Sequence, residues 1–190
     1  MCSDGSFKDG HGTASWIALN GDLEMGGDLV VPDGVHSPYR SELAGILGCL
    51  RFLDSLPVSV LPREARLICD GLSALQMAFG CLPLQASSSN YDLLRVIRLH
   101  RSSVIQKGVR LSPVHVLGHA EERLECGPFM LEETLNMRMD SRAKAFWSLH
   151  NMRGWELSPL QGSCVVRWQQ SPVEVKDLGE LISGAQLKEY

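Results

Sequence analysis

The sequence lacks long apolar runs and any excess of positive charge. Its best apolar stretch, Leu43 to Leu50, is eight residues long, whereas a membrane-spanning helix needs roughly 18. Lysine and arginine number 18 against 22 aspartates and glutamates, for a net charge of −4. Nothing in the bulk composition therefore indicates nucleic-acid binding, and such a function would have to come from a local site.

Signals for secretion and for cysteine-based scaffolds are also missing. The first residues meet an acid at Asp4 and show no basic-then-apolar signal pattern, so we expect an intracellular protein of the cytoplasm or nucleus. No C-x-x-C pair occurs, which argues against a zinc ribbon or a disulfide framework and fits a reducing compartment. The six cysteines lie far apart, at Cys2, Cys49, Cys69, Cys81, Cys126 and Cys164.

The length and apolar content suit a folded domain. A chain of 190 residues with 44% apolar residues fits one domain, or one domain with an appendage, and argues against general disorder. Thr13–Leu19 is rich in β-formers, Asn20-Gly21 is a strong hairpin turn, and Leu23–Val31 resumes the apolar content. From Tyr39 to Leu56 the period becomes helical, with Ser37-Pro38 as a suitable start.

The middle of the chain alternates strands and helices. Ala65–Asp70 and Leu111–Leu117 are typical of short strands, and a short helix is expected after Gly71. Longer amphipathic helices are expected at Tyr91–Gln106 and Glu133–His150. Hairpin strands followed by strand–helix alternation predict an α/β fold with a mixed sheet.

The last forty residues differ in composition from the rest. Cys164–Trp168 and Val173–Val175 are typical of a small hairpin. A helical apolar stripe then predicts a terminal helix, with Leu178, Leu181, Ile182 and Ala185 on one face. We therefore expect one domain over residues 1–150 and an accessory hairpin plus helix over residues 151–190.

Four carboxylates follow or interrupt apolar segments: Asp4, Glu42, Asp70 and Asp140. An ionised carboxylate in such a position is costly unless a positive charge compensates it, and neighbouring carboxylates raise one another's pKa values. Clusters of this kind suit Mg²⁺ or Mn²⁺, which prefer oxygen ligands. Two such ions about 4 Å apart can activate a water and stabilise the leaving oxygen of a phosphodiester.

Each acid has an ordinary structural interpretation when taken alone. Asp4-Gly is a common turn, and Glu42 suits a solvated helix face. Asp70 suits the N-cap of the following helix, and Asp140 can pair with Lys144 one helical turn later. These alternatives stay open for each residue by itself.

Five motifs in order along the chain resemble the ribonuclease H domain. They are Asp4-Gly-Ser before a glycine-rich hairpin, Tyr39-Arg-x-Glu42-Leu-Ala, Asp70 before Ser73-Ala-Leu, Val114-His-Val-x-Gly-His119 and Asp140-x-x-Ala-Lys144. The resemblance spans roughly residues 1–150. In detail the sequence looks most like the domains attached to reverse transcriptases of retrotransposon-type elements.

The resemblance implies a five-stranded mixed sheet flanked by helices and an endonuclease that hydrolyses the RNA strand of RNA–DNA hybrids. Two Mg²⁺ ions, or Mn²⁺, would be held by Asp4, Glu42, Asp70 and Asp140, and the products would be 5′-phosphomonoesters. His119 would assist proton transfer or product release. An upstream reverse transcriptase domain in a longer polyprotein is the implied partner, beside the hybrid itself.

Basic residues near these acids are the candidates for substrate contacts. Arg40 and Lys144 stand next to ligand positions, and Arg98 and Arg101 lie on the second expected helix, where a solvated face is the ordinary alternative.

The first strand of the expected sheet is short at its start. Only Met1, Cys2 and Ser3 precede Asp4, fewer residues than the family's first strand has. We expect a truncated central strand whose neighbours lose part of their pairing.

Two other functions are compatible with the same motifs. The first is a different nuclease of this fold, such as a 3′–5′ exonuclease or an integrase-like strand transferase, but Gly118-His119 upstream of Asp140-x-x-Ala-Lys favours ribonuclease H. The second is a catalytically weak or degenerate module that binds a partner or supports a larger polyprotein. A binding module has no physical need for four mutually repelling acids.

Overall fold

The computed structural model describes residues 1–21, 23–32, 35–81, 83–87, 90–118, 130–153, 167–168 and 171–172. The chain divides into a unit from Met1 to Ser158 and a unit from Pro159 to Tyr190. The first unit is an α/β fold with a mixed five-stranded sheet, which confirms the predicted fold class. Among the described residues, no helix combines the length and apolar character that crossing a membrane requires.

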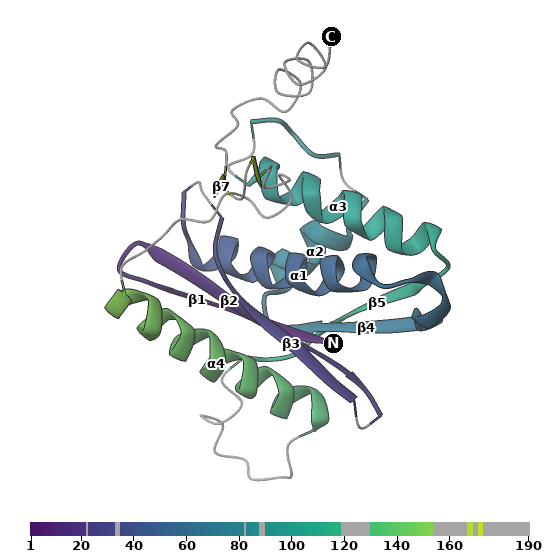
Figure 1. The fold of residues 1–190 in the computed structure, drawn as a ribbon, viewed down its shortest axis with the longest axis horizontal. Coiled ribbons are helices and arrows are strands. Elements are labelled where there is room, and N and C mark those ends of the chain that lie inside the picture. The colour runs from purple at the N-terminus through teal and green to yellow at the C-terminus, as the bar shows by residue number, and fades with distance from the viewer. Residues whose placement is uncertain are drawn as a thin grey trace. The chain divides into compact units, whose positions relative to one another are not determined.

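Three antiparallel strands and two parallel strands build the sheet. β2 (His11–Asn20) runs antiparallel to both of its neighbours, β1 (Cys2–Lys8) and β3 (Leu23–Val30). β4 (Glu64–Cys69) lies parallel to β1, and β5 (Arg110–His115) lies parallel to β4. The spatial order is β3-β2-β1-β4-β5 (Figure 1). β1 is therefore central, and it carries the first of the four acids.

Helices cover both faces of the sheet. α1 (Pro38–Ser55), α2 (Leu72–Phe79) and α3 (Tyr91–Gln106) lie on one face, and α4 (Leu131–Arg153) lies on the other (Figure 1). A short 3₁₀ turn, Val58–Val60, follows α1. One apolar cluster lies between the sheet and α4, and a second lies between β4, α1 and α3.

Local capping explains where two of the helices begin. The Ser37 hydroxyl accepts a hydrogen bond from the Arg40 amide over 3.1 Å, and Pro38 stands at the first helical position, as predicted for α1. α4 begins at Leu131, two residues before the predicted start. The Glu133 carboxylate accepts from the Met130 amide at 3.1 Å, so Glu133 caps the first turn instead of starting it.

β5 ends at His115, short of the predicted Leu117. Its partner β4 ends at Cys69, and one further bond from the Val116 amide to the Cys69 carbonyl closes the ladder. Beyond that point no β4 residue remains to pair with, so Leu117 and Gly118 leave the sheet.

In the second unit, β6 (Arg167–Trp168) pairs antiparallel with β7 (Ser171–Pro172). β6 lies within the first expected strand of the hairpin, whereas β7 precedes the second. Val173–Val175 and the expected terminal helix lie outside the described residues. The division into residues 1–150 and 151–190 stays a prediction.

Candidate metal centre

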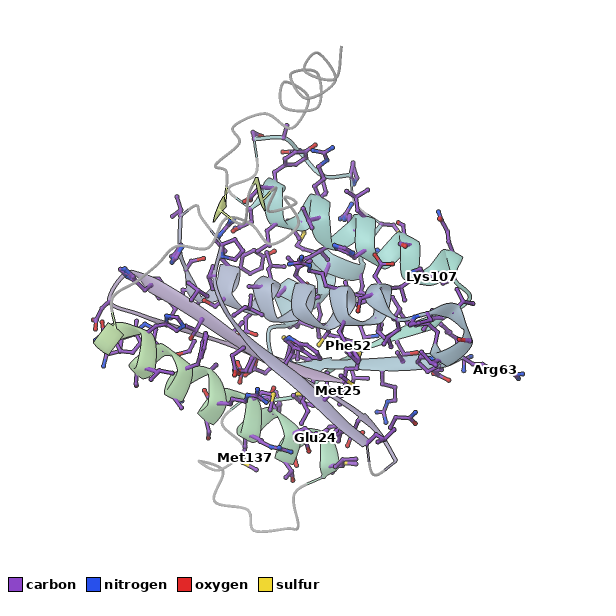
Figure 2. All side chains as sticks on the ribbon, viewed as in Figure 1. Glu24, Met25, Phe52, Arg63, Lys107 and Met137 are labelled. Carbon is purple, nitrogen blue, oxygen red and sulfur yellow. The ribbon has the colours of Figure 1, made fainter. Side chains whose placement is uncertain are left out.

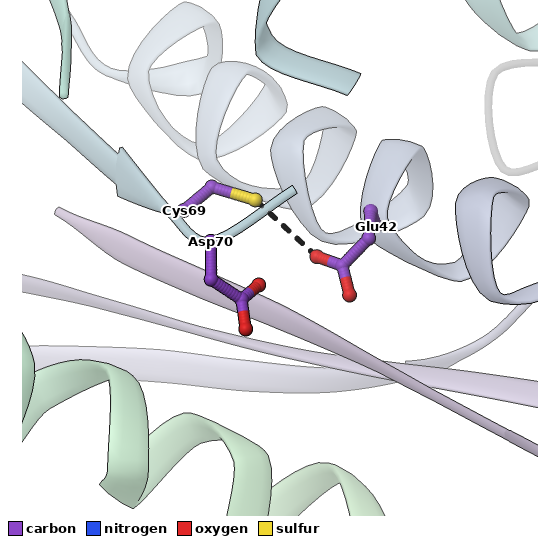
Figure 3. A group of neighbouring side chains, drawn as sticks. All are labelled: Glu42, Cys69 and Asp70. Carbon is purple, nitrogen blue, oxygen red and sulfur yellow. Dashed lines mark hydrogen bonds between the residues drawn. The ribbon is translucent and has the colours of Figure 1, made fainter. Parts of the chain in front are cut away.

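Three of the predicted acids converge where β1, α1 and the end of β4 meet. Glu42 projects from the first turns of α1, and Asp70 directly follows β4, so that both carboxyl groups face the same space (Figure 3). One ligand atom from each of Glu42, Cys69 and Asp70 lies within 4.8 Å of the other two. Asp4 joins this group from β1, because the Gly5 amide lies within hydrogen-bond distance of both its carboxylate and that of Glu42.

Asp4 sits inside the sheet and is only 3% exposed. It lies opposite Ser15 in the β1–β2 ladder. The Gly5 amide is 2.6 Å from Asp4 Oδ1 and 3.3 Å from Glu42 Oε1, so one backbone donor serves both carboxyl groups. A side chain at Gly5 would not fit, because its Cβ would lie 2.5 Å from the Ser41 carbonyl carbon. This close approach of α1 to β1 brings Glu42 next to Asp4.

Glu42 is also held by a buried thiol. Cys69 Sγ donates to Glu42 Oε2 over 3.2 Å, shown as the dashed line in Figure 3, and accepts a hydrogen bond from the Gly71 amide at 3.3 Å. The thiol is fully buried, and its burial and the nearby Glu42 charge raise its pKa well above the ordinary value. Cys69 is therefore a neutral donor that orients the Glu42 carboxylate.

The Asp70 carboxylate lies at the start of α2 and beside the end of β5. The backbone carbonyl of Asp70 lies 3.1 Å from His115 Nε2 and accepts a hydrogen bond from the Leu72 amide at 2.9 Å. A Cβ at Gly118 would lie 2.6 Å from Asp70 Oδ2. A side chain at position 118 would therefore require the Asp70 carboxylate to shift, and the His115 ring lies against the Asp70 backbone.

Asp140 reaches the site from α4, on the opposite face of the sheet. Its charge is one of those that raise the pKa of Asp4. The Lys144 ammonium donates to Asp140 Oδ2 at 2.7 Å, which is the helical pairing considered from the sequence. The structure thus brings Asp140 near Asp4 but gives it a cationic partner of its own.

Three contacts fix α4 in this position. Thr13 Oγ1 donates to the Ala143 carbonyl at 2.9 Å, and Trp147 Nε1 donates to the Lys8 carbonyl at 3.1 Å. Arg142 pairs with Asp28 of β3 through two bonds of 2.6 and 3.0 Å. Since these contacts lie within about two turns after Asp140 along the helix, they set its place against the sheet.

The converging carboxyl groups oppose one another's ionisation. Burial, and then the charges of Glu42, Asp70 and Asp140, raise the pKa of Asp4 far above its ordinary range. Burial and the Asp70 charge likewise raise the pKa of Glu42, against the effect of its hydrogen bonds with Cys69 and Asp4. This is the expected behaviour of acids packed together in a partly dry site without a cation.

No side-chain cation compensates these three acids within the described part of the chain. The ion pairs formed there bring no lysine or arginine to Asp4, Glu42 or Asp70. Carboxylate oxygens in this arrangement fit a hard divalent cation such as Mg²⁺ or Mn²⁺. The carboxyl groups of Asp4, Glu42 and Asp70 therefore suit the predicted metal, and the neutral Cys69 thiol lies next to them.

Arg40 stands beside Glu42 in sequence but not in space. Its guanidinium is fully buried and bonds to Asp92 at 2.6 and 3.0 Å, to the Asn90 amide oxygen at 3.2 Å and to the Pro32 carbonyl at 3.2 Å. A phosphate contact would require it to leave these partners.

The two α3 arginines also have structural partners. Arg98 donates to the Met77 carbonyl at 3.1 Å, and Arg101 donates to the Ala78 carbonyl at 3.3 Å, so both bond to the last turn of α2. Lys144 is more than half exposed beside Asp140. Their predicted contacts with substrate stay predictions.

His119 lies outside the described residues, and its predicted role stays a prediction. Sequence reasoning used Gly118 only as part of the Gly118-His119 motif, and it missed Cys69. The position of Cys69, directly before a strand-end acid, was a usable signal, because adjacent strand residues point to opposite faces and one of them must face α1.

No protein-family model and no curated protein matches the sequence. Among solved structures, the RNase H domain of PFV, studied in solution, aligns with a TM-score of 0.54 at 14% identity, covering 78% of this chain and 93% of that one.

Two further RNase H structures resemble this chain. The N-terminal RNase H domain of a Mycobacterium tuberculosis protein, studied as a fusion with maltose-binding protein, aligns with a TM-score of 0.49 at 15% identity, over 78% of this chain and 94% of that one. RNase H1 of Halobacterium salinarum aligns with a TM-score of 0.45 at 16% identity, over 64% and 87%. The alignment with the PFV domain shows that the chain has an RNase H-like fold, and at 14% identity this likeness shows the fold alone.

Proposed function

We propose that this protein is a metal-dependent endonuclease that hydrolyses the RNA strand of RNA–DNA hybrids and leaves 5′-phosphomonoesters. One observation carries the proposal: carboxyl groups from three distant segments meet beside a central strand without a side-chain cation among the described residues. The RNase H-like fold supports the choice of substrate. The proposal extends to an intracellular location and to a reverse-transcriptase-type polyprotein as the context of the domain.

The residues that would hold two Mg²⁺ ions are Asp4, Glu42, Asp70 and Asp140. Bound there, the ions supply an activated water and stabilise the leaving oxygen of a phosphodiester. The chain itself contributes orientation: the Gly5 amide aligns Asp4 and Glu42, and the Cys69 thiol fixes the second oxygen of Glu42. In this proposal His119 moves the proton to the leaving group or helps product release.

A hybrid whose RNA and DNA strands carry different labels tests this proposal. With Mg²⁺ or Mn²⁺ we expect internal cuts in the RNA strand alone, 5′-phosphate ends on the products, and no cleavage in excess chelator. Cleavage of the DNA strand, or stepwise removal from a 3′ end, would instead favour another nuclease of this fold.

A binding module without cleavage is the second candidate. Two contacts favour it: Lys144 already neutralises Asp140, and the Cys69 thiol already occupies one oxygen of Glu42. Hybrid binding in chelator that is unchanged by Mg²⁺, with no cleavage after metal addition, would establish this alternative.

A further inference from the structure

The Cys69 thiol lies among the carboxyl groups of the metal centre and carries a ligand atom of its own. One ligand atom from each of Glu42, Cys69 and Asp70 lies within 4.8 Å of the other two. In Figure 3 the thiol points at Glu42, and the Asp70 carboxylate turns toward the same space. One sulfur and two oxygens form a different ligand set from the all-oxygen sets that Mg²⁺ prefers.

The distances in this set fit a small tetrahedral ion. Zinc bonds are about 2.3 Å long to sulfur and about 2.0–2.2 Å long to carboxylate oxygen, so sulfur and oxygen lie about 3.5 Å apart in a tetrahedral site. Cys69 Sγ and Glu42 Oε2 are 3.2 Å apart. Because no two of the three ligand atoms are more than 4.8 Å apart, side-chain adjustments of about 1 Å place all three around one ion.

The backbone that follows Cys69 supports a negatively charged sulfur. The Gly71 amide donates to Cys69 Sγ at 3.3 Å, and a hydrogen bond of this kind favours a metal-bound thiolate. Gly71 is also the N-cap of α2, so the positive end of the helix dipole lies next to the sulfur. Neither contribution comes from the two acids, so both are independent of the acidic cluster.

A cation reaches the thiol by way of the two acids. Cys69 is fully buried, whereas Glu42 and Asp70 are both half-buried and in contact with solvent. A divalent cation that the two carboxylates attract therefore arrives next to the sulfur.

We propose that Glu42, Cys69 and Asp70 give the metal centre a second binding mode, selective for a thiophilic divalent cation such as Zn²⁺. As the metal–sulfur bond forms, the S–H bond breaks and its proton leaves to solvent, with no change of oxidation state. Mg²⁺ prefers oxygen and leaves the thiol as a donor to Glu42.

The two binding modes exclude each other because they share Glu42 and Asp70. A bound Zn²⁺ would therefore displace Mg²⁺ and switch the proposed nuclease off. The inference rests on the metal centre of the proposed function, but it does not rest on cleavage.

A Cd²⁺ titration followed by ultraviolet absorbance tests the proposal. Cd²⁺ is a thiophilic probe, and its bond to a thiolate gives a charge-transfer band that oxygen ligands do not give. We expect such a band in the parent, and we expect excess Mn²⁺ to remove it. Cys69→Ser should lose the Mn²⁺-sensitive band and bind Zn²⁺ more than about 10-fold less tightly, since removing even an outer-shell partner of a ligand costs that much. Retained Mn²⁺ binding shows that the variant is folded.

Matched variants separate this site from other thiols and other acids. Cys81→Ser replaces an exposed cysteine and should keep the Mn²⁺-sensitive band. Glu42→Gln leaves the thiol in place but should lose the band, so it gives an answer even where Cys69→Ser does not fold. Its control is Glu24→Gln on β3, which should keep the band. Glu24 pairs with Arg138 and is labelled in Figure 2.

Equal bands in the parent and Cys69→Ser would overturn the proposal, and so would a band that persists in excess Mn²⁺ or in Glu42→Gln. None of these readouts involves cleavage. The band in a protein that cuts no hybrid would support the second binding mode and contradict the proposed function. Cleavage by a protein without the band would do the reverse.

Discussion

The Cys69 thiol donates a hydrogen bond to Glu42 Oε2 over 3.2 Å, linking the last residue of β4 to the first turns of α1. This contact lowers the pKa of Glu42, against the burial and the Asp70 charge that raise it. The thiol thus favours the ionised form of a carboxylate that the proposed metal centre requires.

Replacing Cys69 tests this role. Cys69→Ala removes the donor, so the pKa of Glu42 should rise, and Mn²⁺ binding should require a higher pH than in the parent. Cys69→Ser keeps a donor and should behave like the parent. Calorimetric Mn²⁺ titrations across a pH series measure this, and coincident midpoints for all three proteins would exclude the role.

The raised pKa values of Asp4 and Glu42 predict how stability depends on pH without metal. The unfolded carboxyl groups ionise near pH 4, whereas their folded pKa values are raised. Their contribution is therefore fully present below about pH 4 and is lost as the pH rises through the folded values. In chelator, the melting temperature should fall from mildly acidic to alkaline pH by more in the parent than in Asp4→Asn.

Asp4→Asn removes an acid whose ionisation the folded site opposes, while keeping the shape of the side chain. We expect the variant to melt higher than the parent in chelator at neutral pH, and Mg²⁺ to stabilise the parent more than the variant. A variant that melts lower than the parent throughout this range would show that Asp4 is not destabilised by its acidic neighbours.

The buried guanidinium of Arg40 predicts a structural role for Asp92. Asp92 is 42% exposed, so water can replace part of the lost interaction. Asp92→Ala should therefore lower the free energy of unfolding by about 1–3 kcal/mol. Glu64→Gln, at the exposed Arg110–Glu64 pair, is the control and should lower the free energy of unfolding by clearly less, because solvent screens an exposed ion pair. If Asp92→Ala and Glu64→Gln lose equal free energy of unfolding in urea, the ion pair of the buried Arg40 guanidinium contributes no more than an exposed one, which would contradict this prediction.

The role of His119 in proton transfer or product release is predicted from the sequence alone. If it moves protons or aids product release, His119→Ala should slow hybrid cleavage by about 10²-fold, the low end for acid–base catalysis. Mn²⁺ affinity should stay close to that of the parent. Loss of Mn²⁺ binding together with activity would make His119 a metal ligand instead.

Much of the fold follows from local patterns in the sequence. α1 and α3 have one apolar face each, and Ser37-Pro38 is a strong start signal, so both helices form where they were predicted. The start of α4 depends on Glu133 capping Met130, a choice between two adjacent turns that periodicity does not resolve. The end of β5 depends on where β4 ends, which is a tertiary constraint.

The site was only partly predictable for the same reason. The motif order identifies the acids, but the Cys69 contact depends on how closely α1 approaches β1 at Gly5. The arginines show the opposite case. Proximity to Glu42 in sequence suggested a substrate contact for Arg40. The two residues are two positions apart on the helix and so lie on different faces, and the Arg40 side chain points toward Asp92 and Pro32.

Cleavage of a labelled RNA–DNA hybrid by Asp70→Asn tests the proposed metal centre most directly. Asp9→Asn is the control, because Asp9 is an exposed turn residue with φ of 50°, a conformation that asparagine also adopts. With Mg²⁺, we predict that Asp70→Asn cleaves about 10³-fold or more slowly than the parent and still shows a cooperative thermal unfolding transition. Asp9→Asn should keep the parent rate. An Asp70→Asn rate within a few-fold of the parent would contradict the account.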